Sequence, residues 1–221
     1  MIAQAIKTLW RKKFVIITLA ILIAFLPMAM TNEATVLSKT ILTAIGIDKK
    51  DDEYIVTVEN MIFNFDPFGV PEREHTTAVA STIDEALAEI STNKGRKISF
   101  SHCSLVLLGS GLADTNLVNL LMPFLIKPQF SNGAILMWTE NDIEKVFETS
   151  EEIGDVRSGK LQQIATFNKR TDGRVATSLE EFIRNSKSRD GIARLNIIEE
   201  SDGDIINSNR VIELKFGVIL D

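Results

Sequence analysis

Hydrophobic and polar residues follow one another from residue 41 onward in patterns typical of both strands and helices. Strands are predicted where β-branched and aromatic residues alternate with polar ones, or form short apolar runs between turn residues. The first two, at 41–47 and 54–62, flank the charged segment 48–53, which predicts an antiparallel hairpin with a longer loop. Further strands are expected at 76–80, 98–108, 134–138, 192–198 and 211–220.

Helices are predicted between these strands by apolar residues at helical spacing and by capping signals. Thr82 and Glu85 form a capping box at one start, and Gly95 suits a left-handed cap at the end of that helix. A second helix is expected at 117–125, kinked or split at Pro123. Shorter helices are expected from Asn141 to Phe147, at 161–167 and after Ser178, whereas 63–75 and 148–159 are expected to be irregular.

The order of these elements sets the predicted fold class. Strands and helices interleave without a strict βαβ rhythm, and the first two strands form a hairpin. This pattern predicts an α+β domain, with a mixed β-sheet and packed helices, over residues 41–221.

The first thirty residues have a different pattern, which is typical of a membrane-targeting segment. Residues 14–30 form a run of 17 without a charge, near the lower limit of about 17–25 residues for a spanning helix. The preceding residues 1–13 carry four cations, and the first acidic residue of the chain is Glu33. Basic residues beside an apolar span stay in the cytoplasm, so 1–13 is predicted to be cytoplasmic and the chain after the span to face outward.

The apolar run is interpreted either as a cleaved signal peptide or as an uncleaved signal-anchor. Its end offers Pro27-Met28-Ala29 and Ala29-Met30-Thr31 in place of a small-x-small cleavage site, and Cys103 is too distant for a lipoprotein anchor. An uncleaved anchor, one N-terminal transmembrane helix followed by a linker at 31–40, is therefore favoured over a cleaved signal peptide. The four flanking cations disfavour a third interpretation, a buried helix of a soluble core. The predicted membrane-anchoring residues include Phe14, Ile16, Leu19, Ile21, Phe25 and Met30.

Composition narrows the class of protein. Hydrophobic residues make up 45% of the 221 residues and charged residues 24%, which is typical of a folded domain. The net charge of −6 disfavours a nucleic-acid partner recruited by overall charge. Without the four N-terminal cations the chain carries 20 basic and 30 acidic residues, so anionic lipid headgroups would repel its outward domain. One cysteine excludes an internal disulfide and a cysteine-based zinc site, and two histidines leave little room for a His-rich metal centre.

One glycine-containing turn and two acidic turns are candidate ligand sites. Gly109-Ser110-Gly111 lies between a predicted strand and a predicted helix, where a phosphate-binding turn would lie. The place of a third glycine is taken by Asp114, so a tight structural turn is favoured. The acidic segments 48–53 and 202–204 lack the ligand spacing of a calcium loop and are interpreted as solvated turns.

The segment His102-Cys103-Ser104 contains the residue types of a nucleophilic site. His102 and Cys103 would point to opposite faces of the predicted strand, so they could not act together as base and nucleophile. Ser104 shares the face of His102, but no nucleophile elbow surrounds it. Structural roles are favoured for all three, and no catalytic, cofactor-binding or metal-ligating residues are predicted.

The segment 61–70 is the strongest candidate for a contact surface. It places Phe63, Phe65 and Phe68 in a loop with Pro67 and Gly69, where aromatic rings are costly to leave in water. One interpretation is that the loop folds back onto the core. The other is a partner-contact surface in which the three phenylalanines are the anchors.

Several segments taken together are similar to one protein family. They are 44–48 (AIGID), 54–58 (YIVTV), 82–86 (TIDEA), 101–109 (SHCSLVLLG) with Leu112-Ala113, and the last segment, 211–220. With these segments, the chain from about residue 40 to 221 resembles the N-terminal domain of the spore germinant receptor C subunit, the Ger(x)C (GerC-like) family. The resemblance implies a non-enzymatic extracytoplasmic subunit that assembles with two integral-membrane subunits that sense nutrients.

The sequence thus predicts a membrane-anchored, outward-facing α+β domain that acts through protein contacts. The expected role is that of an accessory subunit of a nutrient germinant receptor in spore germination, located in the spore inner membrane beside integral-membrane receptor subunits. A signal-anchored scaffold protein of the cell envelope or of sporulation is the alternative. An envelope hydrolase is disfavoured, because the sequence offers only scattered carboxylates and two isolated histidines.

Overall fold

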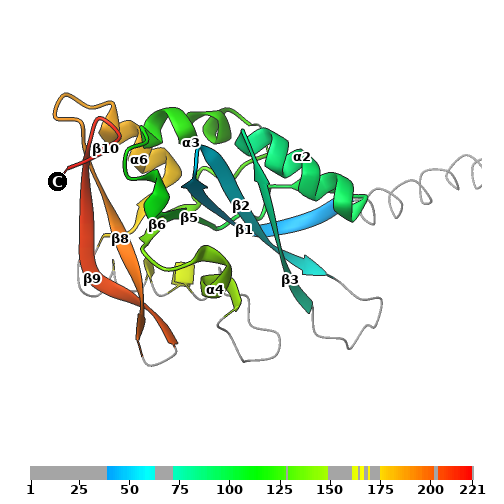
Figure 1. Cartoon of the computed structure of the whole chain (residues 1–221). Helices are drawn as coiled ribbons and strands as arrows, with labels where there is room; N and C mark the ends of the chain where they lie inside the picture. The colour runs from blue at the N-terminus through cyan, green and yellow to red at the C-terminus, as the bar shows by residue number, and fades with distance from the viewer. Residues whose placement is uncertain are drawn as a thin grey trace, which may run out of the picture. The chain divides into compact units, whose positions relative to one another are not determined.

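The computed structural model describes residues 39–62, 72–127, 129–148, 161–163, 165–166, 169, 175–201 and 204–220. They form a ten-stranded mixed sheet with helices on both faces, which confirms the predicted α+β fold (Figure 1). The predicted transmembrane segment 14–30 and nearly all of the predicted linker lie outside the described residues. Within the described ranges, no helix has the length and apolar character needed to cross a membrane.

The sheet has parallel strands at its centre and antiparallel strands at both edges. Its order is β10-β9-β8-β6-β5-β1-β2-β3, and β4 and β7 pair with β1 and β6 beside this path. Neighbours are parallel from β1 through β5 and β6 to β8, and antiparallel elsewhere along the path. The strands are β1 (Lys39–Lys50), β2 (Glu53–Ile62), β3 (Glu72–Ala80), β4 (Lys97–Ser99), β5 (Leu105–Gly109), β6 (Ile135–Thr139), β7 (Thr177–Ser178), β8 (Ile192–Ser201), β9 (Asp204–Lys215) and β10 (Val218–Ile219).

The central strands are apolar on both faces because helices cover both. Every residue of β5 and of β6 is buried, as expected for parallel strands in the middle of a sheet. Figure 1 shows α2 (Ile83–Lys94), α3 (Leu117–Ile126) and α6 (Leu179–Ser186) above the sheet and α4 (Ile143–Glu148) below it. The larger core lies under α2, α3 and α6, and a second core lies under α4 and the helical residues 161–163 and 165–166.

The helix ends are formed by the capping residues that the sequence singles out, with one correction. Thr82 Oγ1 accepts a hydrogen bond from Glu85 N at 3.2 Å, and Gly95 adopts a left-handed φ of 60° at the other end of α2. Ser178 Oγ likewise accepts from Glu181 N at the start of α6. The predicted cap at Asn141 is wrong by one residue: Asp142 Oδ1 accepts from Glu144 N at 2.9 Å instead.

The first hairpin is tighter than predicted. Lys50 pairs with Glu53, so the turn consists of two residues in place of the expected longer loop. Asp51 and Asp52 occupy both turn positions with φ of 50° and 66°, which aspartate tolerates better than most residues with a side chain. Strand β3 also begins earlier than predicted, because residues 72–75 pair with β2 and are not irregular.

Two segments predicted as single strands are interrupted. The segment 98–108 divides into β4 and β5, because a turn closed by the hydrogen bond from Cys103 N to Phe100 O separates them. The segment 211–220 divides at Phe216 and Gly217, whose φ values of 53° and 86° form the turn between β9 and β10. Alternation of apolar residues continues through the second turn, so the hydrophobic pattern alone does not reveal it.

Pro123 does not split the helix, since α3 runs from Leu117 to Ile126 without interruption. Proline lacks the N–H that would bond to the carbonyl of Asn119. Both residues are exposed, so water can bind the carbonyl that the proline leaves unpaired.

Gly46 of β1 allows α4 to approach the sheet, and its substitution is expected to destabilise the fold. A Cβ at this position would overlap Ile143 Cγ2 and lie 3.2 Å from a ring carbon of Phe147. The Gly46→Ala variant is therefore expected to lose about 1–3 kcal/mol of unfolding free energy by overpacking, measured by urea denaturation.

Gly133→Ala is the matched control for Gly46→Ala. A Cβ at Gly133 would meet only Ser131 Oγ, at an ordinary contact distance of 3.9 Å. Its unfolding free energy is expected to stay within about 0.5 kcal/mol of the parent. Equal effects of the two substitutions would contradict the close packing of α4 on β1.

Candidate functional site

The residues predicted as partner anchors lie outside the described part of the chain. Phe63, Phe65 and Phe68 belong to the segment between β2 and β3 that the structure does not describe, so their role stays a prediction. The same holds for the six predicted membrane-anchoring residues within 14–30 and for the acidic turn at 202–203. The described residues offer other candidate sites, which follow from the geometry.

The Gly109-Ser110-Gly111 turn holds a carboxylate of its own chain. Asp48 Oδ1 accepts hydrogen bonds from Gly111 N at 2.9 Å and from Lys49 N at 2.8 Å. A Cβ at Gly109 would overlap the Asp48 carboxylate, and one at Gly111 would overlap Lys49 O. The carboxylate thus occupies the place of an external anion, and it ties the ends of β1 and β5 together.

The acidic segment 48–53 is bound largely within itself. Besides the contacts of Asp48, Lys49 Nζ pairs with Asp52 Oδ1 at 3.0 Å, and the pKa of Lys49 is raised by this bond. Asp52 is almost fully exposed, with 97% of its side chain accessible. These contacts agree with a structural turn.

The His102-Cys103-Ser104 segment lies between β4 and β5 and is not part of a strand, so the strand geometry predicted for it is wrong. His102 is exposed on the turn between β4 and β5, whereas Cys103 is completely buried in the larger core. Cys103 Sγ donates to Leu105 O at 3.4 Å, and burial raises the pKa of the thiol to about 12. A thiol with this pKa is a poor nucleophile near neutral pH.

A cleft lies between the first turn of α2 and helix α3. It has a volume of about 450 Å³ and is lined on its apolar side by Tyr54, Ile83, Leu120, Pro123 and Phe124. An ion pair spans it, from Lys127 Nζ at the end of α3 to Asp84 Oδ1 at 2.6 Å. The same ammonium group lies 5.2 Å from the ring centre of Phe124, so one cation links the charged rim to the aromatic wall.

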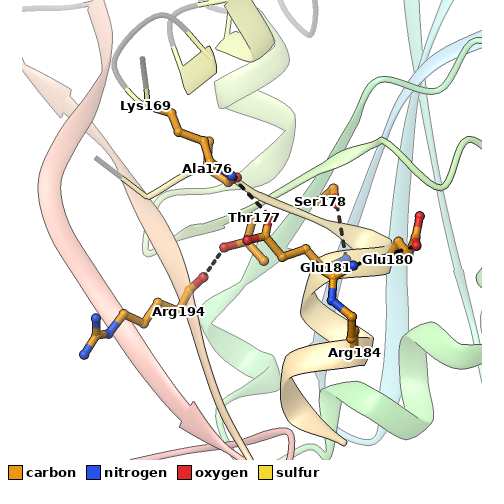
Figure 2. Close-up of polar contacts among 8 residues, drawn as sticks. All are labelled: Lys169, Ala176, Thr177, Ser178, Glu180, Glu181, Arg184 and Arg194. Carbon is orange, nitrogen blue, oxygen red and sulfur yellow. Dashed lines mark hydrogen bonds and ion pairs between the residues drawn. The ribbon is translucent and has the colours of Figure 1, made fainter. Parts of the chain in front are cut away.

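A polar pocket of about 410 Å³ lies beside the start of α6, and Figure 2 shows its contacts. Lys169 Nζ donates to Ala176 O at 2.9 Å and to Glu181 Oε2 at 3.2 Å. Thr177 Oγ1 donates to Arg194 O at 2.6 Å, which joins β7 to β8. The lysine and the glutamate therefore satisfy one another and the backbone, as expected for a group that holds segments together.

The sheet is open on one face near its C-terminal edge. Cross-strand pairing places Ile192, Lys215 and Val218 in one row, and Arg194 pairs with Glu213 in the next. The opposite face of β8 packs into the larger core through Ala193 and Leu195, so the first face lies on the side of α4. We call it the C-terminal sheet face; its members are Ile192, Arg194, Val211, Glu213, Lys215, Val218 and Leu220.

The C-terminal sheet face combines apolar side chains with an internal ion pair. Its four apolar members are each 41–47% exposed. Arg194 Nε lies 2.6 Å from Glu213 Oε1, so the two charges compensate one another. An apolar surface of this kind with a small net charge is typical of a contact region.

The mixed-sheet domain, whose candidate sites are surfaces and clefts, matches one known protein family. A family model described as "Spore germination protein N-terminal domain" matches residues 37–200. The match covers most of the chain, so the chain belongs to this family, and the resemblance derived from the sequence is confirmed. No curated protein and no solved structure matches.

The family match supports a role like that of the C subunit of a germinant receptor. It extends from the start of β1 through nearly all of β8, whereas β9 and β10 lie beyond it. The C-terminal sheet face is thus built partly from strands inside the matched range and partly from strands that follow it.

Cys103 is expected to be unreactive in the folded protein, because burial keeps the thiol protonated. A thiol reagent at about pH 8 should label the chain only after unfolding in guanidinium chloride, and labelling reports this residue alone, because the chain has one cysteine. The pKa of the unfolded thiol is about 8.5, so the unfolding free energy should fall as the pH rises from there toward 12.

A Cys103→Ala variant is the control for the alkaline effect. It is expected to lose less unfolding free energy than the parent over the same pH range, because the ionising group is gone. Rapid labelling of the folded parent would show that Cys103 is accessible and would contradict its buried role.

Proposed function

We propose that this protein is a non-enzymatic accessory subunit of a nutrient germinant receptor that acts in spore germination through protein contacts. The family match over residues 37–200 is the observation that supports this most strongly, because it spans almost the whole described domain. The proposed subunit assembles with integral-membrane receptor subunits at the spore inner membrane.

The chemistry of the described candidate sites supports a binding role over an enzymatic one. The Cys103 thiol is completely buried and has a raised pKa, whereas His102 is exposed on the turn before it, so the two side chains do not share one cavity. Lys169 and Glu181 are engaged with one another and with the backbone. An enzyme needs convergent acid, base or nucleophilic groups in one cavity, so these arrangements favour protein contact.

Attachment to the membrane is proposed through residues 14–30. Their uncharged run and the four preceding cations favour a signal-anchor with the domain on the outer side. The acidic surface expected of the remaining chain would not bind anionic lipid by itself, so the anchor supplies the attachment.

The C-terminal sheet face is proposed as a contact surface for a receptor subunit. Its apolar side chains stand on the uncovered half of a sheet face whose other half is buried under α4. Burying the apolar side chains against a partner would remove them from water. The Arg194–Glu213 pair and Lys215 would cost desolvation free energy if fully buried, so the proposed contact keeps these charges at its solvated rim. The predicted phenylalanine loop is the second candidate surface.

The test is affinity purification of the tagged chain from cross-linked membranes of sporulating cells, with mass spectrometry of the recovered proteins. Recovery of two multi-spanning receptor subunits would support the proposed role. Recovery of envelope or sporulation scaffold proteins in their place would overturn the receptor assignment and favour the scaffold alternative.

Substitutions on the C-terminal sheet face are expected to weaken this recovery. Val211→Glu and Val218→Glu place a charge where an apolar contact would form, so recovery of receptor subunits should fall by at least about fivefold. Ile126→Glu is the control, because Ile126 is 71% exposed at the end of α3 on the other side of the sheet.

Phe65→Ser and Phe68→Ser test the alternative surface in the same experiment. Loss of recovery in these variants, with Val211→Glu and Val218→Glu unchanged, would assign the contact to the phenylalanine loop. Circular dichroism and thermal melting of each variant separate a lost contact from a lost fold.

Membrane attachment gives a separate prediction. The intact chain is expected to stay in the membrane fraction through high-salt and carbonate washes. Replacing Leu19 and Ile21 together by Lys should release it, since each charge at the centre of a span costs about 3 kcal/mol of insertion free energy. A shortened soluble form of the unaltered chain would show that the segment is a cleaved signal peptide.

A further inference from the structure

Three side chains with metal-ligating atoms meet where the edge strand β3 passes α4. They are His75 from β3 and Glu144 and Glu148 from α4, and one ligand atom of each lies within 4.8 Å of the other two. His75 Nε2 lies 3.5 Å from Glu148 Oε1. The glutamates are four residues apart on a helix, so they lie on the same side of it.

The elements that carry these groups are held rigidly by the fold. Strand β3 pairs with β2 along all nine of its residues, from Ile62↔Glu72 to Tyr54↔Ala80. Helix α4 buries Ile143, Val146 and Phe147 in the second core and packs closely against Gly46. The positions of the two backbone segments that carry the imidazole and the carboxylates are therefore set by packing that does not involve the three groups themselves.

The charges at this place favour a cation. Two carboxylates at helical spacing of four repel one another, and a bound cation would relieve this repulsion. Glu59 on β2 is the cross-strand partner of His75. Glu59 is completely buried and is bound by Thr43 Oγ1 at 2.9 Å and by Arg73 Nη1 at 3.7 Å, so it belongs to the core and not to the cluster.

We propose that His75, Glu144 and Glu148 bind a divalent transition-metal ion of the zinc class. A ligand set of one imidazole nitrogen and two carboxylate oxygens favours ions of this class over magnesium and calcium, which prefer oxygen ligands alone. Ligand atoms around tetrahedral zinc lie about 3.3 Å apart, close to the 3.5 Å between His75 and Glu148. Small side-chain rotations of the exposed glutamates would bring a carboxylate oxygen of Glu144 to the same distance from the other two ligand atoms.

The bound ion would join the edge strand to the helix below the sheet. Three protein ligands leave a fourth tetrahedral position for a water molecule. The sequence did not indicate this site, because His75 and the two glutamates are far apart along the chain and show no motif spacing. Binding here is independent of the receptor role, so either can fail without the other.

The test uses the purified full chain in mild detergent, stripped of metal with a chelator. Zinc chloride is titrated by calorimetry, and cobalt chloride by visible absorption. One ion per chain is expected, with a raised midpoint of thermal unfolding. The cobalt spectrum should lack thiolate charge-transfer bands, because Cys103 is buried.

Substitutions assign the ion to the three residues. His75→Gln, Glu144→Gln and Glu148→Gln should each weaken zinc binding by at least about tenfold. Substitution of a residue that only hydrogen-bonds a metal ligand already lowers metal affinity by about that factor, and loss of the ligand itself has a larger effect. Glu144 and Glu148 are exposed, so their variants are expected to fold even if His75→Gln does not. His102→Gln is the matched control, because His102 is the only other histidine of the chain and should leave binding unchanged.

Histidine resonances give a second readout. With only two histidines, manganese chloride should broaden the ring signals of His75 and leave those of His102 sharp. Absence of zinc binding, equal binding in the glutamine variants, or loss of binding in His102→Gln would overturn the site and leave an ordinary surface ion pair between His75 and Glu148.

Discussion

The burial of the parallel strands β1, β5 and β6 on both faces is the constraint on which the other parts of the structure depend. Strands that are apolar on both sides must be covered on both sides, which places α2, α3 and α6 above them and α4 below. Gly46 lets α4 come close to β1, and Asp48 binds the turn that follows β5. These two residues lie on the same strand, so β1 fixes both the lower helix layer and the ends of the central strands.

The same constraint explains where the molecule offers surfaces. Helical cover extends over the central strands, whereas the antiparallel strands at the two edges are covered less completely. At one edge, β8, β9 and β10 expose the C-terminal sheet face with its Arg194–Glu213 pair. At the other edge, β3 brings His75 to the glutamates of α4. These two candidate sites therefore lie where the covering layers end.

Membership of the spore germination protein N-terminal domain family gives this architecture its biological setting. Ion pairs such as Lys169–Glu181 in Figure 2 hold segments of the domain together. A rigid surface loses little conformational entropy on binding, so even a modest apolar area on it can contribute to affinity.

The sequence by itself determined the fold class, the pairing of the first two strands, and the caps at Thr82, Gly95 and Ser178, because these depend on local propensity and on hydrophobic period. It also indicated the family, through the resemblance of several segments. Only the tertiary structure decided the turns at 100–104 and 216–217; in the second of these, the alternation of apolar residues continues through the change of direction. It also decided the continuity of α3 through Pro123, since that depends on exposure to water. The His75–Glu144–Glu148 cluster and the C-terminal sheet face had no signal in the sequence, because strand order and register bring their residues together and neither is encoded in local spacing.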